Sequence, residues 1–308
     1  MQTIVDMGQC KRIWYGPSDE REATRLFRRS FELPAGDLPR AKLEIFADTR
    51  YHVWINGCYL GRGPTFFHPH RRPVADHDIA SMLRAGTNVV AVLVHAVGYA
   101  LHNHIGSGHP GLVARISLSD TTGGVTTIVT DHRWRVTDKT GWRHDVPRRG
   151  WALAGVECFD SDQAPDGWRT PEFDDCDWAM AEEHAHFKPG WEGVYLATGL
   201  PGLKHKFEPC FLHAGPFLFE DAPSAYRDDA PPQEWGLALS GVERQQAPCV
   251  KIEQLSVETG GFSLSGLNGR RNIAVAFDLL SEMTGSLIFK LECQSGGVID
   301  IGWSERLG

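Results

Sequence analysis

The sequence has few features of a membrane, secreted or disulfide-linked protein. Its longest apolar run, residues 89–94, is far shorter than the ~20 residues of a membrane-spanning helix. The first 15 residues include Asp6, Lys11 and Arg12, so they lack the continuous apolar core of a signal peptide. The seven cysteines are odd in number and form no CxxC pair, which indicates neither a disulfide framework nor a zinc ribbon. We therefore expect a cytoplasmic protein with no membrane partner and with reduced, mostly buried thiols.

Basic residues are also too few for a general nucleic-acid binder. The chain has 31 Lys and Arg against 39 Asp and Glu, a formal net charge of −8, whereas phosphate backbones are bound by a positive surface. No glycine-rich phosphate loop and no Gly-x-Ser-x-Gly elbow is present. The sequence thus predicts no nucleic-acid partner, no cofactor and no serine hydrolase.

Turn-forming residues and short alternating segments are abundant instead. The 308 residues include 33 glycines and 18 prolines. Apolar residues recur with period two at 43 and 45 and again at 53 and 55, which is typical of half-buried strands. Asn56-Gly57 follows the second pair and supplies the two residues with positive φ that a type I′ hairpin turn requires. We predict a hairpin whose return strand begins at Tyr59.

Further segments predict one short helix and many strands. Ile79, Met82 and Leu83 are spaced on one helical face, and Gly86 supplies a stop. Residues 89–94 are rich in β-branched side chains without polar alternation, which predicts a strand covered on both faces. Other strands are expected at residues 112–118, 125–130, 134–136, 262–264, 273–277, 287–291 and 298–303. This pattern predicts an all-β protein built on an antiparallel β-sandwich.

A proline-rich stretch divides the chain. Residues 201–232 hold six of the 18 prolines, which favours an interdomain segment there. We expect a first β-sandwich domain over residues 1–215, a linker over 216–249 and a second, apparently incomplete β-domain over 250–308.

Several segments, in their order along the chain, resemble the N-terminal region of bacterial α-L-rhamnosidases. They are residues 27–33, 47–51, Trp54-Ile-Asn-Gly57, Gly61-Arg-Gly-Pro64, 83–90, 167–178 and 277–285, with Trp303-Ser-Glu-Arg-Leu307 at the end. The resemblance implies a galactose-binding-like jelly roll followed by the start of a concanavalin-like domain. Relatives of this type hydrolyse terminal α-L-rhamnosides with carboxylates in an (α/α)6 barrel.

That barrel has no counterpart in the sequence. After Glu183 no segment of 10–15 residues has helical periodicity, and no acid/base pair can be assigned. We therefore expect a non-catalytic region, inactive alone, whose partners are the absent catalytic barrel and a rhamnoside. The alternative is a free-standing carbohydrate-binding module.

Histidines and aromatic residues form the candidate sugar-binding rim. His68 and His70 lie in one cluster, and Tyr99, His102 and His104 follow the strand at 89–94 in a glycine-containing loop. Such side chains hydrogen-bond hydroxyls and stack on pyranose faces. Surface histidines and a zinc site are the competing interpretations, and we assign no metal.

An acidic segment offers a second candidate. Glu172, Asp174, Asp175 and Asp177 could supply oxygen ligands for Ca²⁺, but acidic residues in such loops more often cap turns. The neighbouring Trp168, Phe173 and Trp178 could stack on a sugar or pin the loop to the sandwich. We favour turn caps and anchoring aromatics.

Overall fold

The computed structural model describes residues 3–35, 40–102, 104–119, 124–148, 153–190 and 192–198, and the backbone of 210–217, 251–256, 261–265 and 272–278. The chain divides into two compact units, Met1–Leu200 and Pro201–Gly308. This division lies nearer the N-terminus than the expected domain limit at residue 215, which stays a prediction.

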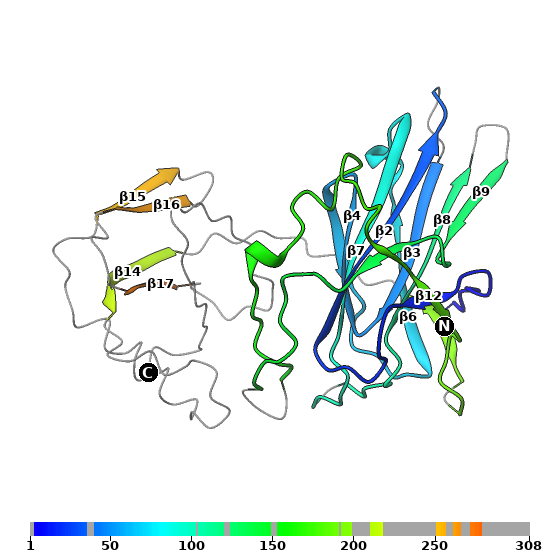
Figure 1. Cartoon of the computed structure of the whole chain (residues 1–308), viewed down its shortest axis with the longest axis horizontal. Helices are drawn as coiled ribbons and strands as arrows, with labels where there is room; N and C mark the ends of the chain where they lie inside the picture. Colours follow the sequence, from blue (N-terminus) through cyan, green and yellow to red (C-terminus); the bar gives the residue numbers. More distant parts are fainter. Residues whose placement is uncertain are drawn as a thin grey trace. The chain divides into compact units, whose positions relative to one another are not determined.

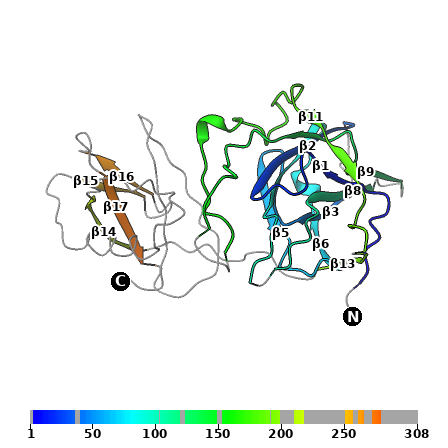
Figure 2. The same cartoon turned by 60° about the horizontal axis from the view of Figure 1, so that its bottom comes forward.

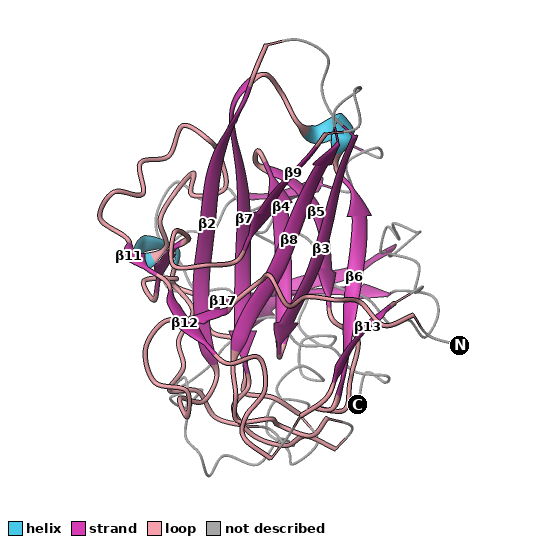
Figure 3. Ribbon diagram, turned by 90° about the vertical axis from the view of Figure 1, so that its right-hand side faces the viewer, coloured by secondary structure: helices cyan, strands magenta, loops and turns pink. Residues whose placement is uncertain are grey.

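Two sheets build the first unit (Figures 1 and 3). The first sheet has the order β12 (Glu182–His184), β1 (Arg12–Trp14), β8 (Gly111–Ser119), β3 (Arg40–Asp48), β6 (Arg71–Asp78) and β13 (Val194–Ala197), with β9 (Val125–Val129) beside β8. The second sheet has the order β11 (Ala179–Met180), β10 (Arg135–Thr137), β2 (Ala23–Leu33), β7 (Gly86–Ala96), β4 (Arg50–Ile55) and β5 (Cys58–Gly63). The predicted all-β sandwich is confirmed. Its pairs are antiparallel apart from β6 and β13, which run parallel.

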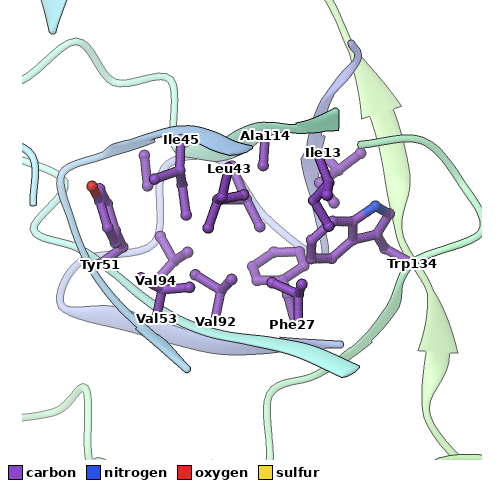
Figure 4. Packing of buried hydrophobic residues seen from close by; sticks show 14 of the residues in the cluster. Ile13, Phe27, Leu43, Ile45, Tyr51, Val53, Val92, Val94, Ala114 and Trp134 are labelled. Atoms are coloured by element: carbon purple, nitrogen blue, oxygen red, sulfur yellow. The ribbon is translucent and has the colours of Figure 1, made fainter. Parts of the chain in front are cut away.

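The core lies between the two sheets (Figure 4). Strand alternation directs one set of side chains inward from each sheet. Leu43 and Ile45 of β3 face Val92 and Val94 of β7, and all four are fully buried. Trp134 closes one side of the cluster and donates its indole N–H to the Val129 carbonyl at 2.9 Å. Each such aliphatic side chain contributes about 1.5–3 kcal/mol of burial free energy.

Strand β7 is covered on both faces, as its sequence predicts. Its inward residues Val90, Val92 and Val94 belong to the main core, whereas Ala91 packs on the opposite face with Leu26 and Trp168. An irregular segment over residues 160–178 supplies that second cover. This arrangement explains why residues 89–94 show no polar alternation.

Buried arginines tie irregular segments to the sheets. Arg28, 1% exposed, donates to the carbonyls of Trp168, Thr170 and Phe173, and its Nε lies 2.7 Å from the Asp175 carboxylate. Other buried arginines do the same elsewhere: Arg12 donates to Pro110 and Ala185, and Arg72 to Pro69 and His186. Burial of a guanidinium is tolerated only when its donors are satisfied, so these contacts fix the backbone of the segments they hold.

The predicted hairpin is confirmed, whereas the predicted helix is shorter than expected. Asn56 and Gly57 have φ of +50° and +83° between β4 and β5, which confirms the turn. The helix expected around residues 79–83 is a single 3₁₀ turn, η1 (Ala80–Met82). Ile79 and Leu83 are buried on either side of it, so a short turn is enough to place the apolar face.

A second 3₁₀ turn, η2 (Ser161–Gln163), lies at the end of a long excursion from the strands, drawn in green (Figures 1 and 2). This excursion is an irregular ribbon in which Trp142 bridges Phe159 and Arg148 bridges Gly155. Backbone hydrogen bonds cross the ribbon from Arg143 to Cys158 at 2.9 Å and from Asp160 to Gly141 at 2.8 Å.

The two ends of the first unit are paired. Val5 donates its backbone N–H to Tyr195 at 2.9 Å, and Ala197 donates to Thr3 at 2.8 Å. Ile4 and Leu196 form an antiparallel bridge between these bonds. Residues near both ends of the unit therefore lie side by side at the edge formed by β13.

The second unit contains two described strand pairs. Strand β14 (Cys210–Phe217) pairs with β17 (Asn272–Asp278), and β15 (Lys251–Ser256) pairs with β16 (Gly261–Ser265). The strands predicted at 262–264 and 273–277 are confirmed. Those predicted at 287–291 and 298–303 lie outside the described residues, as does the Trp303–Leu307 segment.

The expectation of mostly buried thiols is wrong for the described part of the chain. Cys10 is buried and Cys158 half-buried, whereas Cys58 and Cys176 are exposed, all four being free. Burial raises the pKa of the Cys10 thiol to about 12. Among the described residues, no helix is long and apolar enough to cross a membrane.

The Gly57→Val substitution tests the hairpin. A β-branched residue at φ +83° is strained, and its Cβ would meet Thr170 Cγ2 at 3.3 Å. We expect the free energy of unfolding to fall by about 1–3 kcal/mol in urea titrations. The control is Gly57→Asn, because asparagine tolerates this conformation and should cost much less. Equal stability of the valine variant and the native chain would contradict the turn assignment.

Candidate functional site

Five segments meet at one end of the sandwich, which we call the loop end. Their described parts are residues 16–22, 48–49, 64–70, 97–102 with 104–110, and 140–148 with 153–158. They connect to the start of β2, β4, β6 and β8 and to the end of β3 and β7. All five predicted rim residues lie here. The structure places four of them in two separate clusters, and His102 is exposed in the same loop as His104.

The first cluster contains three of the predicted histidines. The rings of His68 and His70 stack with centroids 5.1 Å apart, and His70 Nδ1 donates to the Glu192 carbonyl at 2.5 Å. His104 lies edge-on to Phe67 at 5.2 Å and near the exposed Phe66 at 6.4 Å. His68 and His102 are exposed, but His104 is 3% exposed. The His104 ring thus lies buried beside Phe67, and its part in a sugar contact stays a prediction.

Neither ring nitrogen of His104 has a hydrogen-bond partner among the described residues. Burial lowers the pKa of His104, an effect that Asp48 opposes and Arg50 reinforces. The imidazole is thus favoured in its neutral form. Within the residues that the structure describes, no three His, Cys, Asp or Glu side chains are placed to hold a metal ion.

Tyr99 belongs to the second cluster, built around Glu22. The buried Glu22 carboxylate accepts hydrogen bonds from the Tyr99 hydroxyl, from His95 Nε2 at 2.7 Å and from the Gly155 N–H at 2.6 Å. Burial alone would raise the pKa of Glu22, but these donors together lower it. The Arg148 guanidinium lies 4.1 Å above the Tyr99 ring. Tyr99 therefore ties the excursion over residues 140–158 to the start of β2.

Asp48 is the second buried carboxylate of the loop end. It accepts hydrogen bonds from the hydroxyls of Ser107 and Thr49, and Ser107 in turn accepts from the His109 N–H at 3.0 Å. Burial raises the pKa of Asp48 more than Ser107, Arg72 and His104 lower it. Both carboxylates thus serve as acceptors that hold loops, with their oxygens turned away from solvent. Sequence reasoning did not single out Glu22 or Asp48 as site residues.

The acidic segment and its aromatics behave as the favoured interpretation expects. Asp174 caps a turn by accepting from the Cys176 N–H at 3.0 Å, Asp175 binds Arg28, and Glu172 pairs with Arg84 at 2.7 Å. Trp168 is 5% exposed and packs edge-on against Trp54 at 5.4 Å. These contacts pin residues 160–178 to the outer face of the second sheet.

Comparison of the chain with known proteins identifies the family to which this sandwich belongs. The family model described as the alpha-L-rhamnosidase N-terminal domain matches residues 36–191. The chain belongs to this family. That range includes all five predicted rim residues and Asp48, but not Glu22.

The individual proteins that match this chain include several rhamnosidases. An alpha-L-rhamnosidase of Streptomyces avermitilis is 29% identical over 203 residues, which cover 63% of this chain and 16% of that protein. The crystal structure of the GH78 family rhamnosidase of Bacillus sp. GL1 matches with 30% identity and a TM-score of 0.60, over 68% of this chain and 22% of the other. An alpha-L-rhamnosidase structure from Aspergillus terreus, at 17% identity and a TM-score of 0.53, shares the fold over 68% of this chain and 24% of its own. The chain thus spans less than a quarter of each relative.

Substitution of His104 tests its buried, unpaired state. His104→Ala leaves a cavity beside Phe67 and should lower the free energy of unfolding by about 2–3 kcal/mol. His104→Phe keeps the shape and removes two unsatisfied nitrogens, so its stability should equal or exceed that of the native chain. Thermal unfolding followed by circular dichroism measures both, and the exposed His102→Ala is the matched control. A phenylalanine variant as unstable as the alanine variant would show that the nitrogens are satisfied.

The Glu22 cluster predicts an acid-sensitive loop end. Because the folded-state pKa of Glu22 is below its unfolded value of about 4.3, its stabilisation is present above that value and is lost as the pH falls through the folded pKa. Glu22→Gln should be less stable at neutral pH and should show a flatter fall in stability below about pH 5. Urea titrations across this range give the comparison, with the exposed Glu157→Gln as control. Parallel pH profiles for the native chain and Glu22→Gln would refute this role.

Proposed function

We propose that the chain is the non-catalytic N-terminal region of an α-L-rhamnosidase-like glycoside hydrolase and supports hydrolysis of terminal α-L-rhamnosides by a catalytic barrel outside these residues. The observation that carries the proposal is the family match over residues 36–191, on a sandwich shared with rhamnosidase structures. The small share of each relative that the chain covers is consistent with a supporting region.

The chemistry of the loop end supports a non-catalytic role. Inverting hydrolysis of a glycoside uses two carboxyl groups that flank the bond with room for a water molecule. Glu22 and Asp48 have opposite pKa shifts, a pattern also found in acid/base pairs, but both carboxylates are buried and bonded to loop donors. Their hydrogen bonds serve the fold of the loops.

A rhamnoside contact at the loop end is part of the proposal. His68, His70 and His102 are the residues through which it would act, together with the exposed Phe66 next to His104. Tyr99 and His104 complete the proposed set. Such a contact contributes little affinity alone, since millimolar binding corresponds to only about 4 kcal/mol. The cytoplasmic location stays a prediction.

Assay of p-nitrophenyl α-L-rhamnoside hydrolysis tests the proposal. The 308-residue chain should show no turnover above a buffer control, whereas the Streptomyces avermitilis rhamnosidase serves as the positive control. Turnover that survives repurification and is lost in Asp48→Asn or Glu22→Gln would place catalysis within this chain. Submillimolar binding of L-rhamnose without turnover would favour the free-standing binding module.

A further inference from the structure

The outer face of β4 and β5 carries aromatic side chains that the main core does not use. Arg50, His52 and Trp54 alternate with the buried Tyr51, Val53 and Ile55, so they point away from the core. Tyr59 lies opposite Trp54 across the hairpin and is 47% exposed. Strand β5 is the last strand of its sheet, so this face lies at an edge of the sandwich.

These rings form a continuous surface. Trp54 and Tyr59 meet edge-on at 5.6 Å, and His52 stacks on Trp54 at 6.0 Å. The Tyr59 hydroxyl lies 3.3 Å from His52 Nδ1, which fixes the orientation of both rings. Trp168 buttresses Trp54 from the other side, so the aromatic surface is supported from below and open at Tyr59.

Guanidinium groups flank this surface. Arg169 lies 4.8 Å above the Trp54 ring, and Arg62 is directly opposite His52 in the hairpin. Burial, first, and then the charges of Arg62 and Arg169 lower the pKa of His52. Burial lowers the pKa of Arg169, and the negative charge of Asp166 opposes this effect. Two cations beside open aromatic rings complement a ligand with apolar faces and a negative charge.

We infer that this face, formed by Tyr59, Trp54 and His52 with Arg62 and Arg169, binds a glycan that carries carboxylate groups. A pyranose ring stacks its C–H face on Tyr59, and a uronate carboxylate pairs with a flanking guanidinium. The net charge of −8 opposes a nucleic acid, which carries a phosphate at every nucleotide. A glycan in which acidic and neutral sugars alternate has half that charge density. This site is separate from the loop end and does not depend on the proposed function.

Isothermal titration with two matched probes tests the inference. The first probe is a tetrasaccharide of alternating L-rhamnose and D-galacturonate, and the second is its methyl ester, which lacks the charge. The native chain should bind the acid form at least about fivefold more tightly than the ester, and about 0.5 M salt should remove the difference. No binding of either probe up to about 10 mM would overturn the proposal.

Variants separate stacking from charge. Tyr59→Ala should weaken both probes by about five- to tenfold, whereas Tyr59→Phe should retain binding because the ring remains. Arg62→Gln should weaken only the acid form. Phe159→Ala is the matched control, since Phe159 is 49% exposed on the distant excursion and should leave binding unchanged.

Two further results would refute the inference. One is unchanged affinity in both Tyr59→Ala and Arg62→Gln, each shown to be folded by its melting temperature. The other is an effect of Tyr59→Ala on self-association in sedimentation with none on either probe, which would make the face a protein contact.

Discussion

Desolvated guanidinium groups hold the irregular parts of the first unit against its two sheets. Arg12, Arg28 and Arg72 are each at most 3% exposed, and every one donates to backbone carbonyls of segments outside the main strands. A buried cation without acceptors would be costly, so these carbonyls cannot move without leaving a charge unsatisfied. The cover of β7, the ordered aromatic surface beside Trp54 and the segment at Ala185 and His186 all depend on this constraint.

The regular part of the fold could be predicted because its signals are local. Alternation places the strands around Leu43 and Val53, and Asn56-Gly57 specifies a turn through its own backbone preferences. The tethers could not be predicted, because Arg28 has the same local pattern as any exposed arginine of a strand. Its partners lie about 140 residues further along the chain. The helix near Ile79 shortens to one turn because burial of two side chains requires no more.

At the candidate site, too, the sequence does not reveal contacts between residues that are far apart in the chain. Sequence proximity grouped Tyr99 with His102 and His104, but Tyr99 bonds to Glu22, 77 residues away, and His104 packs on Phe67. Burial raises the pKa of both carboxylates of the loop end, but the net shifts are opposite. Three donors, including a backbone N–H, keep Glu22 ionised, whereas the hydroxyls around Asp48 do not offset its desolvation. The number and kind of donors, which only the folded chain reveals, decide the direction of each pKa shift.

The pairing of residues 3–5 with 195–197 makes the first unit a module with a single point of attachment. The chain enters and leaves it side by side, so the sandwich can hang from a neighbouring polypeptide as one closed loop of chain. Genetic exchange could transfer such a module between proteins at one surface position, without separating the strands on either side of the join.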